Sequence, residues 1–296
     1  MTLKEAYVTN ERTRSSVTSW IDRADWEAPP SFFNYGLPHW AYPWVNLPVG
    51  AHPVGHDLIS FLGAQLRSPR RLHYLEVGVS VGKCLFTQLQ FFGKGALVMA
   101  FDLEEINPAF ERLLTPAKPP VLASWTEERL RPGVNTQRRV PGHEHVDTIK
   151  AFTSPAGGEL RYLSSDEFNA VGWEHLQKQG IAFDLIYSDA LHTPDALLFE
   201  ATQLLERGLI NHKQFAFVWD DCEGTMVEGA VCPILAQLRK VPGAPPVHFN
   251  IFKIGGWMGD NEAKHHTCVA TTLDLSALRK GDAALAALER VSACGA

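Results

Sequence analysis

Residues 75–82 read Leu-Glu-Val-Gly-Val-Ser-Val-Gly, and this stretch decides the fold. The apolar run over residues 74–77 predicts a buried strand, and Gly78 and Gly82 allow a tight turn with close backbone approach. Apolar residues then recur at helical spacing over 85–92 and end at a glycine, which predicts an amphipathic helix. A strand, a loop and a helix whose N-terminal amides face a ligand predict nucleotide chemistry.

The spacing of the glycines excludes the dinucleotide fingerprint, because G-x-G-x-x-G would need a glycine where the chain has Ser80. Glu76 precedes the first glycine, where a carboxylate would repel a pyrophosphate but can meet an ammonium group. A second apolar run over residues 96–101 ends at Asp102, which Leu103 follows. A carboxylate at that point can accept hydrogen bonds from both hydroxyls of a ribose. An ammonium site beside a ribose site predicts an aminoacyl nucleoside as the ligand.

At this point the sequence resembles the class I S-adenosylmethionine (SAM)-dependent methyltransferases. Their first motif has the form E/D-x-G-x-x-x-G, and their second strand ends in an acid. The resemblance implies that Glu76 and the loop with Gly78, Ser80 and Gly82 hold the methionine part of SAM. It also implies that Asp102 holds the ribose.

Composition and charge set limits on the fold and on the partners. With 296 residues, 45% of them hydrophobic, the chain can bury a sizeable core as one enlarged domain. Its net charge of -6 argues against nucleic acid or an anionic membrane as the main partner. No apolar run approaches a membrane span, and the first residues lack a signal-peptide core. The five cysteines are odd in number without a C-x-x-C pair, which predicts reduced thiols in a cytoplasmic protein.

Later apolar runs alternate with helical patterns, which predicts a parallel sheet covered by helices on both faces. The runs lie at residues 159–163, 183–187, 215–219, 247–254 and 267–272. The last two are joined by a Gly-rich loop and predict an antiparallel hairpin. The expected fold is therefore α/β and Rossmann-like, with a doubly wound, mostly parallel seven-stranded sheet that ends in a C-terminal antiparallel hairpin.

Short polar motifs predict where helices begin. Ser164 with Glu167 has the spacing of a capping box, and Thr193 before Pro194 reads as an N-cap followed by proline at the first helical position. Pro233 is expected to kink the helix that precedes the final hairpin.

Two segments lie outside the predicted core, which with its insertion covers residues 54–296. Residues 1–53 are rich in aromatics and proline, and residues 104–150 form a long insertion. Both are either a cap over the substrate or ordinary surface structure, the first as a satellite core and the second as a solvated loop. The arginines over 129–139 either hold an anionic substrate or lie in solvent. The N-terminal segment is also a candidate surface for a homo-oligomer.

Three acids follow the fourth and fifth predicted strands, which are residues 183–187 and 215–219. Asp189 follows the fourth, and Asp220 with Asp221 follows the fifth. Parallel strands bind ligands at their carboxyl ends, so these carboxylates should lie close together and repel one another unless a cation binds them. Oxygen ligands of this kind suit Mg²⁺ or another hard divalent ion, although aspartates also serve in turns and caps. His192, three residues after Asp189, lies in the same loop and is either a structural residue or a base.

Residues 184–192 and 219–221 resemble the metal-dependent O-methyltransferases that act on sugar hydroxyls of natural products. The resemblance covers roughly residues 54–110 and 160–272 and implies that Asp189, Asp220 and Asp221 hold Mg²⁺, with His192 as the general base. Catechol-type relatives have Asp-Asn where this chain has two aspartates, so neither branch supplies the substrate.

The predicted function is SAM-dependent methyl transfer to a hydroxyl of a small molecule, assisted by a divalent cation. In this mechanism Ser165 and Asp166 meet the adenine edge, and His192 accepts the proton of the alcohol. One alternative is a metal-independent N- or O-methyltransferase, and another is a non-catalytic SAM-binding or scaffold protein. A nicotinamide oxidoreductase is disfavoured, because it should show the third glycine of the dinucleotide fingerprint, which this chain lacks.

Two further features of the sequence have residue types that bind metals or react, a pair of adjacent histidines and a cysteine beside the aspartates. Adjacent residues on a strand point to opposite faces, so His265-His266 is interpreted as a loop or interface feature. Cys222, beside the aspartates, is expected to serve in packing, because nearby carboxylates suppress the thiolate.

Overall fold

The structure is a computed structural model. It describes residues 1–21, 55–66, 70–79, 82–103, 105–106, 110–111, 114, 125–132, 146–154, 156–222, 224–255, 264–275, 278 and 294. The aromatic segment over residues 22–53 and Ser80 of the glycine loop lie outside these described residues.

Nine strands of the described chain form one sheet in the order β3-β4-β5-β2-β1-β6-β7-β9-β8. They are β1 (Leu72–Val77), β2 (Ala96–Asp102), β3 (Trp125–Pro132), β4 (Val146–Thr153), β5 (Glu159–Ser164), β6 (Leu185–Ser188), β7 (Ala216–Trp219), β8 (His248–Gly255) and β9 (Lys264–Thr271). The five central strands are parallel, and an antiparallel pair flanks them on each side. The sheet is therefore mixed, with a parallel centre.

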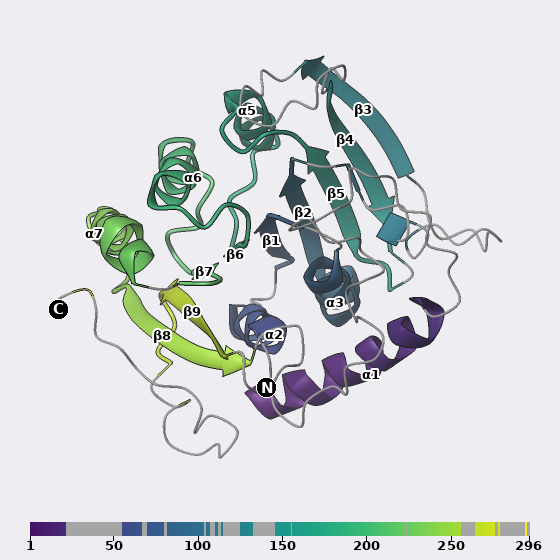
Figure 1. Cartoon of the computed structure of the whole chain (residues 1–296), viewed down its shortest axis with the longest axis horizontal. Helices are drawn as coiled ribbons and strands as arrows, with labels where there is room; N and C mark the ends of the chain where they lie inside the picture. The colour runs from purple at the N-terminus through teal and green to yellow at the C-terminus, as the bar shows by residue number, and fades with distance from the viewer. Residues whose placement is uncertain are drawn as a thin grey trace.

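Helices cover both faces of the sheet (Figure 1). On one side lie α1 (Leu3–Ile21), α2 (Gly55–Leu66) and α3 (Lys83–Phe92), and on the other α5 (Ala170–Lys178), α6 (Pro194–Glu206) and α7 (Cys232–Leu238). Each face has its own hydrophobic core. The short strand β7 contributes to both cores, because successive side chains alternate between the two faces. This explains its uninterrupted apolar sequence.

The predicted count of seven strands was too low by two, because β3 and part of β4 come from the segment predicted as an insertion. Residues 125–132 read Trp-Thr-Glu-Glu-Arg-Leu-Arg-Pro, which is typical of a charged edge strand and gives no apolar signal. The described strands of this insertion extend the sheet. Of the arginine-bearing segment, residues 129–132 belong to β3 and 133–139 lie outside the described part.

The predicted helix starts are correct in one case and wrong in another. The side chain of Thr193 accepts a hydrogen bond from the Ala196 amide and caps α6. Ser164, by contrast, is still paired in β5, and the side chain of Asn169 caps α5 by accepting from the Val171 amide. The capping-box spacing of Ser164 is overruled because the strand continues through it.

The expected disturbance at Pro233 takes the form of a π-helical turn, η4 (Val227–Val231), which directly precedes α7. A proline has no N–H, so the ordinary helical ladder cannot continue there. The Cys232 amide instead donates to the Val227 carbonyl.

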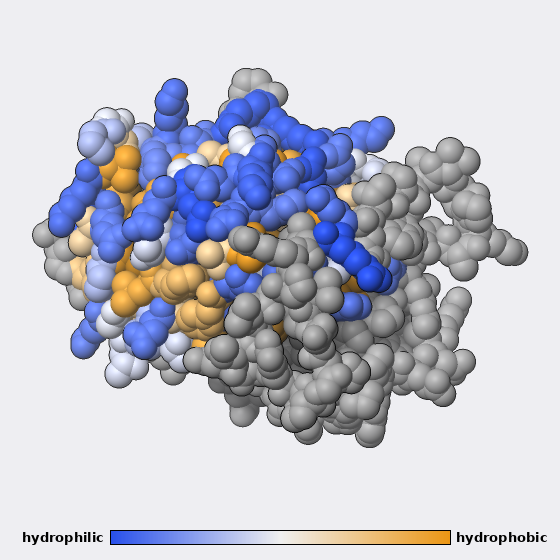
Figure 2. Space-filling view, turned by 90° about the horizontal axis from the view of Figure 1, so that it is seen from above, coloured by the Kyte–Doolittle hydropathy of each residue, from blue (hydrophilic) through white to orange (hydrophobic). Residues whose placement is uncertain are grey.

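Figure 2 looks onto the molecule from the side toward which β2 and β5 point. The described surface on this face is mainly hydrophilic, with hydrophobic residues gathered in one area at the left of the view. Among the described helices, none has both the length and the apolar character that a membrane span requires.

Candidate active site

The carboxyl ends of β1, β6 and β7 are level with one another. The register pairs Glu76 of β1 with Tyr187 of β6, and Ser188 of β6 with Trp219 of β7. The glycine loop after β1, the loop of Asp189 and the loop of Asp220 therefore leave the same edge of the sheet. This is the edge at which open parallel sheets bind ligands.

The glycine loop needs its glycines for backbone reasons. Gly78 and Gly82 have φ values of 81° and 83°, in the left-handed region that favours glycine. A Cβ at Gly78 would lie 2.4 Å from the backbone nitrogen of Ala190, and one at Gly82 would lie 2.8 Å from the ring of Phe110. The first contact joins the loop after β1 to the loop that carries Asp189.

Glu76 is buried beneath this loop, with 1% of its surface exposed. The hydroxyl of Tyr74 donates a hydrogen bond to Glu76 Oε2 at 2.5 Å. Burial raises the pKa of Glu76 to about 8; the Tyr74 hydrogen bond opposes this shift, and the charge of Asp189 adds to it. An ammonium group beside Glu76 would favour its ionised form.

Asp102 ends β2 and holds the glycine loop. Its Oδ2 accepts a hydrogen bond from the Val79 amide at 2.5 Å. Asp102 and the following Leu103 are both partly exposed at the sheet edge. The carboxylate predicted to meet a ribose thus lies next to the loop predicted to hold the rest of the ligand.

The two residues predicted at the adenine edge differ in their surroundings. Ser165 is fully buried, and a Cβ at Gly172 of α5 would lie 3.1 Å from its Oγ. The side chain therefore lies against α5, and its oxygen has no hydrogen-bond partner among the described residues. Asp166 is partly exposed, and its Oδ1 accepts from the Phe168 amide at 3.0 Å.

Asp189 and Asp220 share a hydroxyl group. The Tyr187 hydroxyl lies 3.1 Å from Asp189 Oδ2 and 3.2 Å from Asp220 Oδ2. Burial raises the pKa of Tyr187 well above its ordinary value, and both aspartates raise it further. The phenol therefore keeps its proton and can donate it. On the other side of Asp220, the Thr267 hydroxyl donates to Oδ1 at 3.3 Å.

His192 lies between two carboxylates. Its Nε2 is 3.3 Å from Asp189 Oδ1, and its Nδ1 is 3.5 Å from Asp221 Oδ2. The Nε2 contact is an ion-pair distance without the geometry of a hydrogen bond. Burial of the ring lowers its pKa, but the carboxylates of Asp189, Asp221 and Asp220 together raise it more, so the net shift is upward. A neutral His192 is thus a stronger base than an isolated imidazole.

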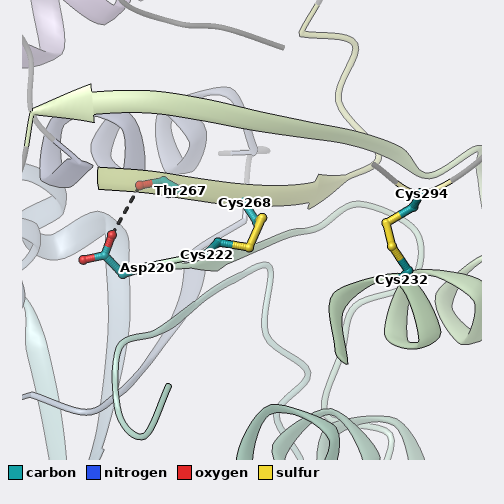
Figure 3. The surroundings of a disulfide bond; sticks show 6 residues. All are labelled: Asp220, Cys222, Cys232, Thr267, Cys268 and Cys294. Atoms are coloured by element: carbon teal, nitrogen blue, oxygen red, sulfur yellow. Dashed lines mark hydrogen bonds between the residues drawn. A yellow bond between two sulfur atoms is a disulfide. The ribbon is translucent and has the colours of Figure 1, made fainter. Parts of the chain in front are cut away.

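A disulfide fixes the loop after β7 (Figure 3). Asp221 has a φ of 44°, and the next residue, Cys222, is bonded to Cys268 of β9. The Cys222 amide also donates to the His266 carbonyl at 2.7 Å. Cys222 therefore does more than pack, and the Asp220-Asp221 loop is tied to β9 from the end that follows the acids.

The expectation of five reduced thiols is wrong. A second disulfide joins Cys232 to Cys294 (Figure 3). The buried Cys84 is a free thiol. The pairs are separated by 46 and 62 residues, and separations of that length leave no local sequence signal. A cytoplasmic location, which was inferred from reduced thiols, loses that support.

The three carboxylates of the acidic edge (Asp189, Asp220 and Asp221) are the candidate ligands for a divalent cation. Three carboxylates supply oxygen donors of the type that Mg²⁺ prefers. Among the described residues, however, no three His, Cys, Asp or Glu side chains are arranged so that they could hold a metal ion. The side chains of Asp189 and Asp221 are 27% and 42% exposed and face His192 in this structure. They would have to turn before they could share a cation.

The two adjacent histidines lie in β9, where His265 pairs with Ile254 and His266 with Lys253. They therefore belong to a strand, and their interpretation as a loop feature is wrong.

Sequence reasoning brought Asp189, His192, Asp220 and Asp221 to one edge but missed Tyr187 and Thr267. Both occur in apolar stretches that were interpreted only as strands. A hydroxyl residue two positions before Asp189, on a strand buried on both faces, was the available signal for Tyr187.

Comparison with known proteins gives structural matches alone. No protein-family model matches the sequence, and no curated protein sequence does. One similar structure is an O-methyltransferase from Bacillus cereus in complex with SAH, with 14% identity over 78% of this chain and 87% of that chain and a TM-score of 0.40. Another is a putative O-methyltransferase from Klebsiella pneumoniae, with 13% identity over 86% of this chain and 96% of that chain and a TM-score of 0.42.

A third is the MycE methyltransferase from the mycinamycin biosynthetic pathway, in complex with Mg, SAH and mycinamycin VI. It has 11% identity over 72% of this chain and 52% of that chain, with a TM-score of 0.37. At these scores the matches carry no argument about function. The function has to be inferred from the residues of the site.

Proposed function

We propose that this protein is a SAM-dependent methyltransferase that transfers a methyl group to a hydroxyl of a small molecule. The observation that carries the proposal is the contact between Gly78 and Ala190. It joins the loop flanked by Glu76 and Asp102 to the loop that leads to His192, so the residues proposed to bind the cofactor lie at the same sheet edge as the proposed base.

SAM would supply a methyl group on a positive sulfonium, which needs only an in-line nucleophile. Glu76 and the amides of the glycine loop would hold its methionine part, and Asp102 its ribose. Asp166, with Ser165 beside it, would meet the adenine edge. These residues orient the donor, and orientation supplies much of the acceleration in a displacement reaction.

His192 would accept the proton of the acceptor hydroxyl. An alcohol is a poor nucleophile because it holds its proton tightly, and a base within reach lowers the barrier. Asp189 and Asp221 on either side of the ring would stabilise the imidazolium that forms. The same carboxylates would hold the ring in its position between them.

A finer proposal is that a divalent cation joins the three carboxylates after Asp189 and Asp221 turn toward it. Its support is the gathering of three like charges at one edge, which costs free energy without a compensating cation. Such an ion would stabilise an alkoxide. The experiment is exhaustive chelation: turnover should vanish and return with Mg²⁺ or Mn²⁺, while SAM binding is kept. Full turnover after chelation would establish the metal-free enzyme.

The N-terminal segment 1–53 and the insertion 104–150, apart from its sheet strands β3 and β4, remain proposed caps over the acceptor, and the N-terminal segment remains a candidate oligomer surface. The proposed function is tested by titration calorimetry with SAM and SAH, followed by a screen of SAM consumption against hydroxylated metabolites and matched amines. SAM binding without turnover on any acceptor would favour a SAM-binding scaffold. Turnover on amines alone would favour N-methylation.

A further inference from the structure

We propose that Tyr187 is a positioning residue, which holds the carboxylates of Asp189 and Asp220 in place and, through Asp189, fixes the orientation of His192. The effect of Tyr187 on the rate of methyl transfer rests on the proposed function. Its effect on the positions of the two aspartates does not.

The backbone of Tyr187 is paired with a strand on both sides. The residue lies in β6 between β1 and β7, paired with Glu76 and Val218, and only 3% of it is exposed. A hydroxyl buried this deeply needs a partner inside the protein. Tyr187 meets this need with the two aspartates that follow β6 and β7.

These contacts belong to a chain that crosses the sheet edge. The Thr267 hydroxyl of β9 reaches one oxygen of Asp220, and the Tyr187 hydroxyl reaches the other. Tyr187 also reaches one oxygen of Asp189, whose second oxygen faces His192 Nε2. Every link is 3.1–3.3 Å long, and Tyr187 is its centre.

The hydroxyl also answers an electrostatic need. Two carboxylates that lie beside one group repel each other and would turn apart if nothing held them. A single O–H can donate to one carboxylate at a time or share its hydrogen between both. Either way it replaces part of the repulsion with attraction.

The structure offers a matched set of variants. Tyr187→Phe removes one oxygen atom and keeps the ring. Tyr162→Phe makes the same change at a buried tyrosine of β5, which pairs with Ala100 and lies away from the acidic edge. Thr267→Val removes the other hydroxyl on Asp220 and leaves the contact of Tyr187 with Asp189 intact.

Crystal structures of the three variants are the first measurement. In Tyr187→Phe we expect the carboxylates of Asp189 and Asp220 to separate and His192 to lose its 3.3 Å contact with Asp189. In Thr267→Val the carboxylate of Asp220 should keep its contact with Tyr187, and in Tyr162→Phe neither carboxylate should move. Unmoved carboxylates in Tyr187→Phe would overturn the proposal, whatever reaction the protein catalyses. If that variant does not fold, an Asp220 that turns away from Tyr187 in Thr267→Val would overturn the proposal, because the contact with Tyr187 would then not hold that carboxylate.

Kinetics and calorimetry are the second measurement. Loss of a hydrogen bond to a charged group should lower kcat about tenfold in Tyr187→Phe. SAM affinity and the KM for the acceptor should stay near parental values, because Tyr187 is not among the residues proposed to bind SAM or the acceptor. A parental kcat in Tyr187→Phe would overturn its role in the reaction. A parent without methyl transfer would overturn the proposed function, while the crystal structures still decide what Tyr187 holds.

Discussion

Gly78 and Ala190 approach each other so closely that a Cβ on Gly78 would lie 2.4 Å from the Ala190 backbone nitrogen. Gly78 belongs to the loop after β1, and Ala190 follows Asp189 in the loop after β6. The loop predicted to hold the cofactor and the loop that carries the acids therefore pack against each other without side chains between them. A shift in one must move the other.

We expect Gly78→Ala to lower the free energy of unfolding and to weaken both SAM binding and turnover. A left-handed φ costs an L-residue about 1–2 kcal/mol, and at this position the clash with Ala190 adds to that cost. Gly208→Ala is the control, because Gly208 has a φ of 65° but no atom within 4 Å of the added Cβ. Equal losses of stability in both variants, by chemical denaturation, would show that the contact is unimportant.

Glu76 should make ligand binding depend on pH. Its pKa of about 8 lies above the ordinary 4.5, so the folded chain keeps a proton that the unfolded chain releases. The unfolding free energy of the ligand-free protein should therefore fall as pH rises from 4.5 toward 8. SAM affinity should rise over the same interval, because the ammonium group of SAM favours the ionised carboxylate.

Glu76→Gln should remove this pH dependence and weaken SAM binding about tenfold or more, as expected for the loss of a charged hydrogen-bonding partner. Glu159→Gln, at an exposed position of β5, serves as the control. Calorimetry across the pH range is the measurement. A SAM affinity in Glu76→Gln equal to that of the parent at every pH would exclude Glu76 as an anchor.

His192→Ala should lower kcat by about 10²–10⁴-fold without changing SAM affinity, because a general base contributes that much. The acidic limb of the parental pH profile should lie above the ordinary histidine value, because carboxylates raise the pKa of His192. In Asp221→Asn the limb should move to lower pH, since one of those charges is lost. Asparagine tolerates the left-handed backbone at that position, so the fold should persist.

His175→Asn is the control for that profile, because His175 lies on α5, away from the acids. An acidic limb that does not move in Asp221→Asn would mean that another group is the base.

The disulfides should matter to different properties. Replacing either pair with serines should cost about 2–4 kcal/mol of stability, given the length of the loops that they close. Only the double variant at Cys222 and Cys268 should also lower kcat, because that bond ties the Asp220-Asp221 loop to β9. The pair Cys232 and Cys294 provides the matched control. Thiol labelling of the denatured, unreduced chain should detect one thiol, Cys84; five would contradict both bonds.

The central strands could be predicted from the sequence because each is an apolar run that ends at a polar residue. Asp102 and Trp219 end strands where the sequence places them. The gathering of Asp189 and Asp220 followed from the parallel arrangement, since carboxyl ends of parallel strands meet at one edge. The close backbone approach predicted at Gly78 and Gly82 is confirmed, and both glycines have a left-handed backbone.

Features that depend on tertiary pairing could not be predicted in this way. The strand β3 is polar because it lies at the sheet edge, and its sequence resembles that of a solvated loop. The capping box at Ser164 failed because pairing with β2 extends the strand through that residue. Cys268, the partner of Cys222, and Asp220, one partner of Tyr187, lie on or after other strands, which local spacing does not reveal.

The most direct measurement is methyl transfer from SAM labelled in its methyl group, in the presence of a panel of hydroxylated small molecules. We predict a labelled methyl ether formed in equal amount with SAH by the parent, and almost none by His192→Ala at unchanged SAM affinity. SAM binding without any labelled ether, or undiminished ether formation by His192→Ala, would contradict a methyltransferase that uses this histidine as its base.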